Sequence, residues 1–211
     1  MLSHSEYVKI LIGLIAIVNP LGAIPIFIGL TDGLAALERA RIANIVALTV
    51  GIILLVSLFV GQFVLDIFGI TIDSFRVGGG ILIMLMAISM MHARISPVVQ
   101  TREEAEESKD RESVAVVPLS MPLLAGPGAI STVILDAHKG SGPAHYGIIA
   151  AAILILALLL RAVLRLSPFL ARRLTATGIN IFTRIMGLIL AAIAVEFIAN
   201  GLKGLFPVLH G

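Results

Sequence analysis

Six long apolar segments constrain this chain more than any other feature of its sequence. They cover residues 7–30, 42–65, 70–91, 114–135, 146–164 and 181–202. Each approaches or exceeds the ~20 residues that a helix needs to cross ~30 Å of hydrocarbon. Charged residues make up only 13% of the 211 residues, against about 25% in soluble domains. The sequence therefore predicts an all-α polytopic membrane protein with six transmembrane helices.

Several function classes are excluded or left without support by the composition. The chain has no cysteine, which excludes disulfides, zinc–thiolate sites and cysteine nucleophiles. Its five histidines show no metal-ligand spacing, and the net charge of +2 does not imply nucleic acid. Hydrolase, metalloprotease and phosphate-loop motifs are absent. We therefore expect no enzyme activity, no cofactor and no metal site.

The two halves of the chain resemble one another. The triplet Gly-Ala-Ile occurs at 22–24 and again at 128–130, each time beside prolines, and residues 69–82 resemble 178–190. Segments one to three thus correspond to segments four to six. Because three spans is an odd number, the second half enters the membrane from the opposite side, which gives an inverted repeat. We predict one membrane domain, 1–211, comprising repeat one (1–93), a charged linker (94–113) and repeat two (114–211).

Prolines break the first and fourth predicted helices near their middles. Pro20 and Pro25 interrupt the first, and Pro122 and Pro127 interrupt the fourth. A proline inside a helix costs ~3 kcal/mol or more and leaves carbonyls unpaired. Backbone groups freed inside a membrane are tolerated only where protein buries them or a cavity hydrates them. Matched breaks in two halves therefore predict a binding site between half-helices.

Nine residues around the breaks form the predicted substrate site. The half-helix N-termini would present N–H groups to a carboxylate, the freed carbonyls would accept from an ammonium, and the amide and hydroxyl side chains would add further contacts. The alternative is that the prolines and glycines serve helix packing alone. The nine residues are Asn19, Pro20, Gly22, Ala23, Gly126, Gly128, Ala129, Ser131 and Thr132.

Four ionisable residues within or beside the spans are candidates for coupling or gating. Glu196 lies midway along segment six, where a carboxylate is costly and marks a cavity, a partner or a proton path. Arg76 and Arg184 begin segments three and six and are candidate gates, and Asp73 can pair with Arg76. The alternatives are a structural hydrogen bond for Glu196 and snorkelling near helix ends for the arginines.

The distribution of Lys and Arg predicts the orientation. Eleven of them fall on one side of the predicted membrane, whereas Lys9, Arg76, Lys139 and Lys203 fall on the other. The positive-inside rule then places both termini outside the cytoplasm. We expect a multi-pass protein of the cell inner membrane with both termini in the periplasm.

Three motifs resemble the MarC family of bacterial and archaeal inner-membrane proteins, and in particular its YchE-like branch. They are NPLGAIPIF at 19–27, PLSMPLLAGPGAIS at 118–131 and TRIMG at 183–187. The resemblance covers almost the whole chain. It implies a six-span protein related to neutral amino acid transporters, some of which move glycine and alanine.

The resulting interpretation is a secondary transporter of small neutral amino acids that works by alternating access around the paired breaks. Its partners would be the amino acid, the lipid bilayer and a coupling proton or sodium ion, with the proton preferred because of Glu196. Two alternatives remain at this stage. One is an exporter or flippase of another small solute or lipid precursor, and the other is a membrane scaffold that transports nothing.

Overall fold

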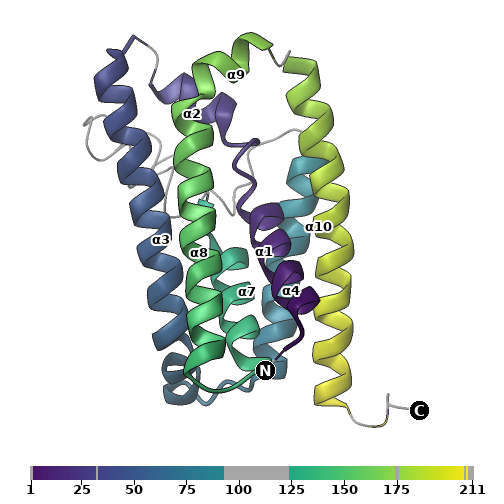
Figure 1. The fold of residues 1–211 in the computed structure, drawn as a ribbon. Coiled ribbons are helices and arrows are strands. Elements are labelled where there is room, and N and C mark those ends of the chain that lie inside the picture. Colours follow the sequence, from purple (N-terminus) through teal and green to yellow (C-terminus); the bar gives the residue numbers. More distant parts are fainter. Residues whose placement is uncertain (1, 32, 93–123, 174–175, 207, 209–211) are drawn as a thin grey trace.

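The computed structural model describes residues 2–31, 33–92, 124–173, 176–206 and 208. Every regular element in these ranges is a helix, as the sequence predicts, and they contain no strand. The long helices run side by side along the height of the bundle (Figure 1). In chain order the elements are α1 (His4–Val18), α2 (Ile24–Leu30), α3 (Ala36–Ile67), α4 (Ile72–Met91), α7 (Pro127–His138), α8 (Pro143–Arg165), α9 (Ser167–Arg173) and α10 (Ala176–Leu205).

The bundle has two distinct ends. One end, here the termini end, holds the start of α1, the turn between α3 and α4, the end of α7 and the end of α10 (Figure 1). The opposite end, here the α2–α9 end, holds these two short helices and the beginnings of α3 and α10. Both chain termini thus lie at the same end, as an even number of membrane crossings requires.

The first apolar segment is divided into two helices. Ser3 caps α1 in a capping box with Glu6, and the Ser3 backbone N–H donates to the Glu6 carboxylate at 2.7 Å. This bond lowers the pKa of Glu6, which precedes the apolar segment. Helix α1 ends at Asn19, whose φ of 47° is left-handed, and α2 begins at Ile24 with Pro25 in its first turn. The structure therefore has the predicted break.

The described part of the fourth segment begins just before its own break. Gly126 is the N-cap of α7, and Pro127 occupies its first turn. Backbone N–H groups in the first turn have no partner within the helix, so a proline there costs no hydrogen bond. The predicted half-helix start near Gly128 is therefore correct to within one turn. The part of this segment before residue 124, including Pro122, lies outside the described residues.

Four helices in the described ranges are long and apolar enough to cross a membrane. They are α3, α4, α8 and the stretch Ile181–Leu205 of α10. At 32 residues, α3 is about 48 Å long at 1.5 Å per residue, so it exceeds the hydrocarbon thickness. Helices α1, α2 and α7 have 15, 7 and 12 residues, which is too short for a full span. The count of six spans stays a prediction.

Two antiparallel helix pairs form the frame of the bundle. Helix α3 packs on α8, where Leu54, Leu58 and Ile153 are almost fully buried. Helix α4 packs on α10 through glycines: a Cβ on Gly80 would lie 3.0 Å from the Ala194 carbonyl oxygen. A Cβ on Gly187 would likewise lie 3.0 Å from the carbonyl oxygen of Ala87. Helices α1 and α7 fill the space between the two pairs.

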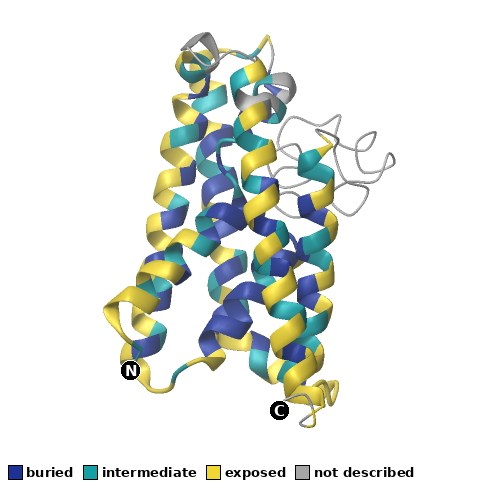
Figure 2. Ribbon diagram, turned by 90° about the vertical axis from the view of Figure 1, so that its right-hand side faces the viewer, coloured by how far each residue is buried: buried dark blue, intermediate teal, exposed yellow. Residues whose placement is uncertain are grey.

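The outer surface of the bundle is apolar. Large side chains such as Phe63 on α3, Leu158 on α8 and Leu188 on α10 are each more than 60% exposed. Figure 2 shows exposed residues along the outer faces of the long helices and buried ones toward the inside. An apolar surface of this extent is typical of contact with a membrane. The arrangement is therefore that of an integral membrane protein.

Candidate functional site

The first break is held together by Asn19. Its side-chain Oδ1 accepts from the Gly22 N–H at 3.2 Å, and its own backbone N–H donates to the Ile15 carbonyl at 2.9 Å. Gly22 has no room for a side chain, because a Cβ there would collide with the Asn19 carboxamide. The Asn19 side chain therefore pairs with one backbone N–H inside the break, that of Gly22.

The second break is closed by backbone and hydroxyl contacts. The Gly126 carbonyl accepts from the Ala129 N–H at 3.0 Å, and the Thr132 hydroxyl donates to the Gly128 carbonyl at 2.8 Å. Ala129, Ser131 and Thr132 are all buried. A Cβ on Gly79 of α4 would lie 3.0 Å from the Ser131 Oγ, so α4 passes directly over this hydroxyl.

The two breaks adjoin where the end of α1 packs against the start of α7. A Cβ on Gly128 would lie 3.7 Å from Ile17, two residues before Asn19, and 3.1 Å from Ile83 of α4. Of the nine predicted substrate-binding residues, Gly128 lies at this junction and only Thr132 lines the cavity described next. Their role as ligands stays a prediction.

A cavity of about 840 Å³ lies between α1, α4, α7 and α10. It begins at Leu2, Glu6 and Lys203 at the termini end and reaches Ile17 and Thr132 beside the junction of the breaks. Its depth therefore runs from the exposed end of the bundle to the N-terminal half of α7.

Charged side chains of both signs line this cavity in equal number. Each of its four walls contributes at least one acid and one base. The acids are Glu6, Asp73, Asp136 and Glu196, and the bases are Lys9, Arg76, Lys139 and Lys203. The four bases are the ones that the sequence places on the less positive side of the membrane. At neutral pH the lining carries no net formal charge, so a ligand with both charges finds partners for each.

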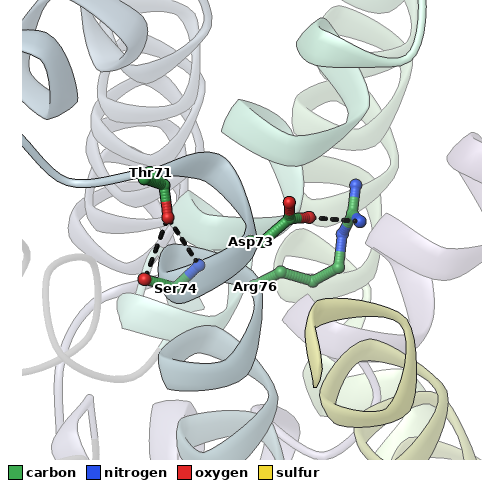
Figure 3. A network of polar contacts seen from close by, with 4 residues as sticks. All are labelled: Thr71, Asp73, Ser74 and Arg76. Carbon is green, nitrogen blue, oxygen red and sulfur yellow. Dashed lines mark hydrogen bonds and ion pairs between the residues drawn. The ribbon is translucent and has the colours of Figure 1, made fainter. Parts of the chain in front are cut away.

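On α4 the charges are fixed at the start of the helix. The Thr71 side chain caps α4 by accepting from the Ser74 N–H. In the first turns of the helix, Arg76 Nη1 donates to the Asp73 carboxylate at 3.1 Å (Figure 3). The Asp73 carboxylate also packs against Gly204 of α10, where a Cβ would collide with it. The pair therefore sits at the seam between α4 and α10.

On α7 a second acid–base pair is more deeply set. Lys139 Nζ lies 2.6 Å from the Asp136 carboxylate, which has only 3% of its side chain exposed. The Asp136 carbonyl accepts from His145 Nε2 at 3.1 Å. This fixes Nε2 as the protonated nitrogen, so Nδ1 accepts the Tyr7 hydroxyl at 2.9 Å when His145 is neutral. The chain of contacts ties α1, α7 and α8 together.

The four predicted coupling and gating residues are divided between two places. Arg76, Asp73 and Glu196 line the cavity. Arg184 does not, and is exposed on α10 near its beginning, 12 residues before Glu196. The structure therefore brings three of the four together and places Arg184 toward the α2–α9 end. None of these positions tests the proposed roles.

Sequence reasoning did not include Glu6, Lys9, Asp136, Lys139 and Lys203 among the candidate site residues. A signal for most of them was present, because an acid is followed three residues later by a base in α1, α4 and α7. Residues three apart share a helix face. Three such pairs on one side of a predicted membrane would have indicated a shared polar surface there.

Comparison with known proteins identifies the family. A model described as MarC family integral membrane protein matches residues 4–206. The chain belongs to the MarC family of integral membrane proteins. The resemblance seen in the sequence motifs is thereby confirmed.

Relatives of this MarC protein occur in bacteria and archaea. The UPF0056 membrane protein YhcE of Escherichia coli (strain K12) is 45% identical over 95% of this chain and 94% of its own. The UPF0056 membrane protein YvbG of Bacillus subtilis (strain 168) is 40% identical over 97% and 98% of the two chains. A UPF0056 membrane protein of Pyrococcus abyssi is 39% identical over 93% and 94%. No solved structure matches the chain.

Proposed function

We propose that this MarC-family protein is a secondary transporter of small neutral amino acids such as glycine or alanine, working by alternating access. The observation that carries the proposal is the cavity of about 840 Å³ with balanced charges, which ends beside the junction of two helix breaks. Its volume is within the roughly 300–1,000 Å³ of small-molecule sites. A scaffold with tightly packed breaks and no cavity fits this arrangement poorly.

The charges of the lining suit a zwitterion. An amino acid brings one ammonium and one carboxylate, and each wall of the cavity offers an acid and a base within three to seven residues of each other. A ligand of net charge would meet as many like as opposite charges. Deeper in the cavity, Thr132 and the apolar Ile17 leave room for a small side chain. These features support a short neutral amino acid as cargo.

The arrangement of helices supports two inverted three-helix repeats and rocking between them. Segments two and five, which correspond in the repeat, are α3 and α8, and these two helices pack together. Segments three and six are α4 and α10, and these also pack together. Correspondence of paired helices is what a two-fold axis in the membrane plane produces. We infer that this state opens at the termini end and that the alternative state opens at the α2–α9 end.

One observation favours a second candidate, a transporter of an amphipathic solute or lipid precursor. The cavity lining includes Ile12 of α1 and Ile189 of α10, which are 59% and 42% exposed. Exposed apolar residues in the lining would give an acyl chain a surface to contact. In this candidate the charged end of the cavity holds a zwitterionic headgroup.

The test is counterflow of radiolabelled alanine and glycine in proteoliposomes of purified protein. The blocking variant is Gly13→Phe, because Gly13 lines the cavity and a Cβ there meets nothing within 4 Å. The matched control is Gly147→Phe on α8, which also meets nothing and does not line the cavity. We expect Gly13→Phe to abolish counterflow and Gly147→Phe to retain it. Equal counterflow in both variants would contradict the cavity as the route.

The same vesicles distinguish the candidates. Movement of a short-chain fluorescent lipid between leaflets, blocked by Gly13→Phe and without amino acid counterflow, would favour the amphipathic solute. Absence of both activities in folded protein would contradict transport of either cargo.

A further inference from the structure

Asp136 differs from the other carboxylates of the cavity in its burial. The residue is 2% exposed, and it is the single acidic residue among the buried polar residues of the described chain. Glu6 and Glu196 are exposed, and Asp73 is partly exposed beside Arg76. A buried carboxylate is costly in its charged form unless a partner compensates it. Asp136 therefore has the strongest reason to change its protonation state when that partner moves.

The compensating partner, Lys139, is partly exposed. Lys139 Nζ is within 2.6 Å of the carboxylate, yet 46% of the Lys139 side chain is exposed. The backbone of Asp136, by contrast, is anchored, because His145 donates to its carbonyl and Tyr7 holds His145 in place. The carboxylate thus keeps its position in the cavity wall while the ammonium can swing toward solvent or toward a ligand carboxylate.

The charged and titratable groups around Asp136 belong to the helices that pack against α7 or border the cavity. From α8 comes His145, which the Asp136 carbonyl engages. On α3 the acidic residue near this end, Asp66, accepts from Gln62 and is not part of the lining. The remaining groups, which line the same cavity, are Glu6 and Lys9 on α1, Asp73 and Arg76 on α4, and Glu196 and Lys203 on α10. Their formal charges cancel, and Lys139 is the base that contacts the Asp136 carboxylate directly.

We propose that Asp136, and not Glu196, carries the coupling proton of this transporter. The inference rests on the proposed function and specifies its ion. When the cargo carboxylate draws Lys139 away, Asp136 takes one proton from water at the termini end and becomes a neutral carboxylic acid. After the cavity reopens at the other end, cargo leaves, Lys139 returns and Asp136 releases that proton there. One proton therefore moves with each cargo molecule.

The test separates exchange from net transport. Counterflow needs no net proton movement, whereas accumulation of alanine against its gradient requires a driving ion. With the membrane potential clamped, one pH unit across the vesicle drives at most a roughly tenfold accumulation for one proton per cargo molecule. We expect Asp136→Asn to lose this accumulation entirely. Its counterflow should continue, because in the proposed cycle Asp136 is a neutral acid while cargo is bound, and the neutral amide replaces that form. The matched control is Asp66→Asn on α3, which lies outside the cavity lining and should retain both. Glu196→Gln changes the lining, and we expect it still to drive accumulation from the pH gradient in proportion to its remaining counterflow.

Three outcomes would overturn the proposal. In the first, Glu196→Gln loses accumulation and Asp136→Asn keeps it. In the second, folded Asp136→Asn loses counterflow along with accumulation. In the third, accumulation by the wild type does not depend on the pH gradient. In the last case the transport proposal still stands. Folding of each variant is checked by size-exclusion chromatography. Asp136→Glu, which keeps a titratable group, should restore accumulation with a shifted pH profile.

A measurement without cargo decides the case in which the wild type moves no amino acid. Infrared difference spectra of the purified protein between acidic and alkaline pH report carboxylic acid groups by their C=O stretch. The wild type is compared with Lys139→Gln. This variant lacks the basic partner of Asp136, so Asp136 should stay protonated to higher pH. A carboxylic acid band that appears in Lys139→Gln and vanishes in the double variant with Asp136→Asn supports the proton site. A band unchanged by Asp136→Asn overturns it.

Discussion

At the scale of single residues, the first helix break depends on the contact between Asn19 and Gly22. We expect Gly22→Ala to destabilise the protein by about 1–3 kcal/mol, since the new methyl group must displace the Asn19 carboxamide. Asn19→Gly keeps the left-handed backbone at φ 47° and removes the obstacle. In that background the cost of Gly22→Ala should fall, giving a coupling energy of about 1 kcal/mol or more.

The double-mutant cycle is measured by thermal unfolding in detergent, followed by far-ultraviolet circular dichroism because the chain has no tryptophan. Additive effects of the two substitutions would show that the Asn19 side chain does not occupy the Gly22 position. The sequence could predict that Asn19 matters at a proline break. It could not predict that the Asn19 side chain accepts from the Gly22 N–H, because this contact depends on the φ and ψ angles of four consecutive residues.

At the scale of elements, the seam between α4 and α10 tolerates no added volume on its inner face. Gly80→Ala would bring a Cβ within 2.7 Å of Ile198 and 3.0 Å of the Ala194 carbonyl, at a cost of about 1–3 kcal/mol. Gly78→Ala, two residues earlier on the exposed face, meets nothing within 4 Å and should stabilise the helix by roughly 0.5–1 kcal/mol. Thermal unfolding of both variants, with opposite signs expected, checks the helix pairing.

A second prediction concerns the tie between α1 and α8. Tyr7→Phe removes the hydroxyl that bonds His145 Nδ1 and should cost about 0.5–1.5 kcal/mol of stability. Tyr146→Phe is the control, because Tyr146 stacks on Phe59 through its ring, and a phenylalanine keeps that contact. Equal melting temperatures for Tyr7→Phe and the wild type would show that α1 is held by other contacts.

Element bounds were predictable to different degrees. The run 42–65 lies inside α3, which extends to Ala36 and Ile67, because a helix continues into polar residues that apolar runs do not include. The starts of α2 and α7 followed from proline and glycine chemistry. The binding site was predicted at the breaks, but the extent of the cavity toward the termini end was not, since its walls come from four helices far apart in sequence. Its charges, taken singly, are indistinguishable from residues that snorkel at helix ends.

At the scale of the whole molecule, the two ends of the bundle differ in charge and have a defined relation to the termini. Lys9, Arg76, Lys139 and Lys203 gather around the cavity at the termini end. Arg39, Arg161 and Arg165 belong to the parts of α3 and α8 at the α2–α9 end. The positive-inside rule uses such a difference between the two ends. The predicted periplasmic location of both termini can therefore be tested by labelling each end.

The absence of cysteine allows single-cysteine labelling with a membrane-impermeant maleimide. Ser3→Cys and Val208→Cys lie at the termini end, and Leu37→Cys, whose leucine is 83% exposed, lies at the α2–α9 end. In intact spheroplasts we expect the first two to react and Leu37→Cys to react only after lysis. Leu54→Cys, at a fully buried position, controls for unfolded protein and should stay unlabelled. Labelling of Leu37→Cys alone would reverse the orientation, and unequal labelling of Ser3→Cys and Val208→Cys would contradict an even number of spans.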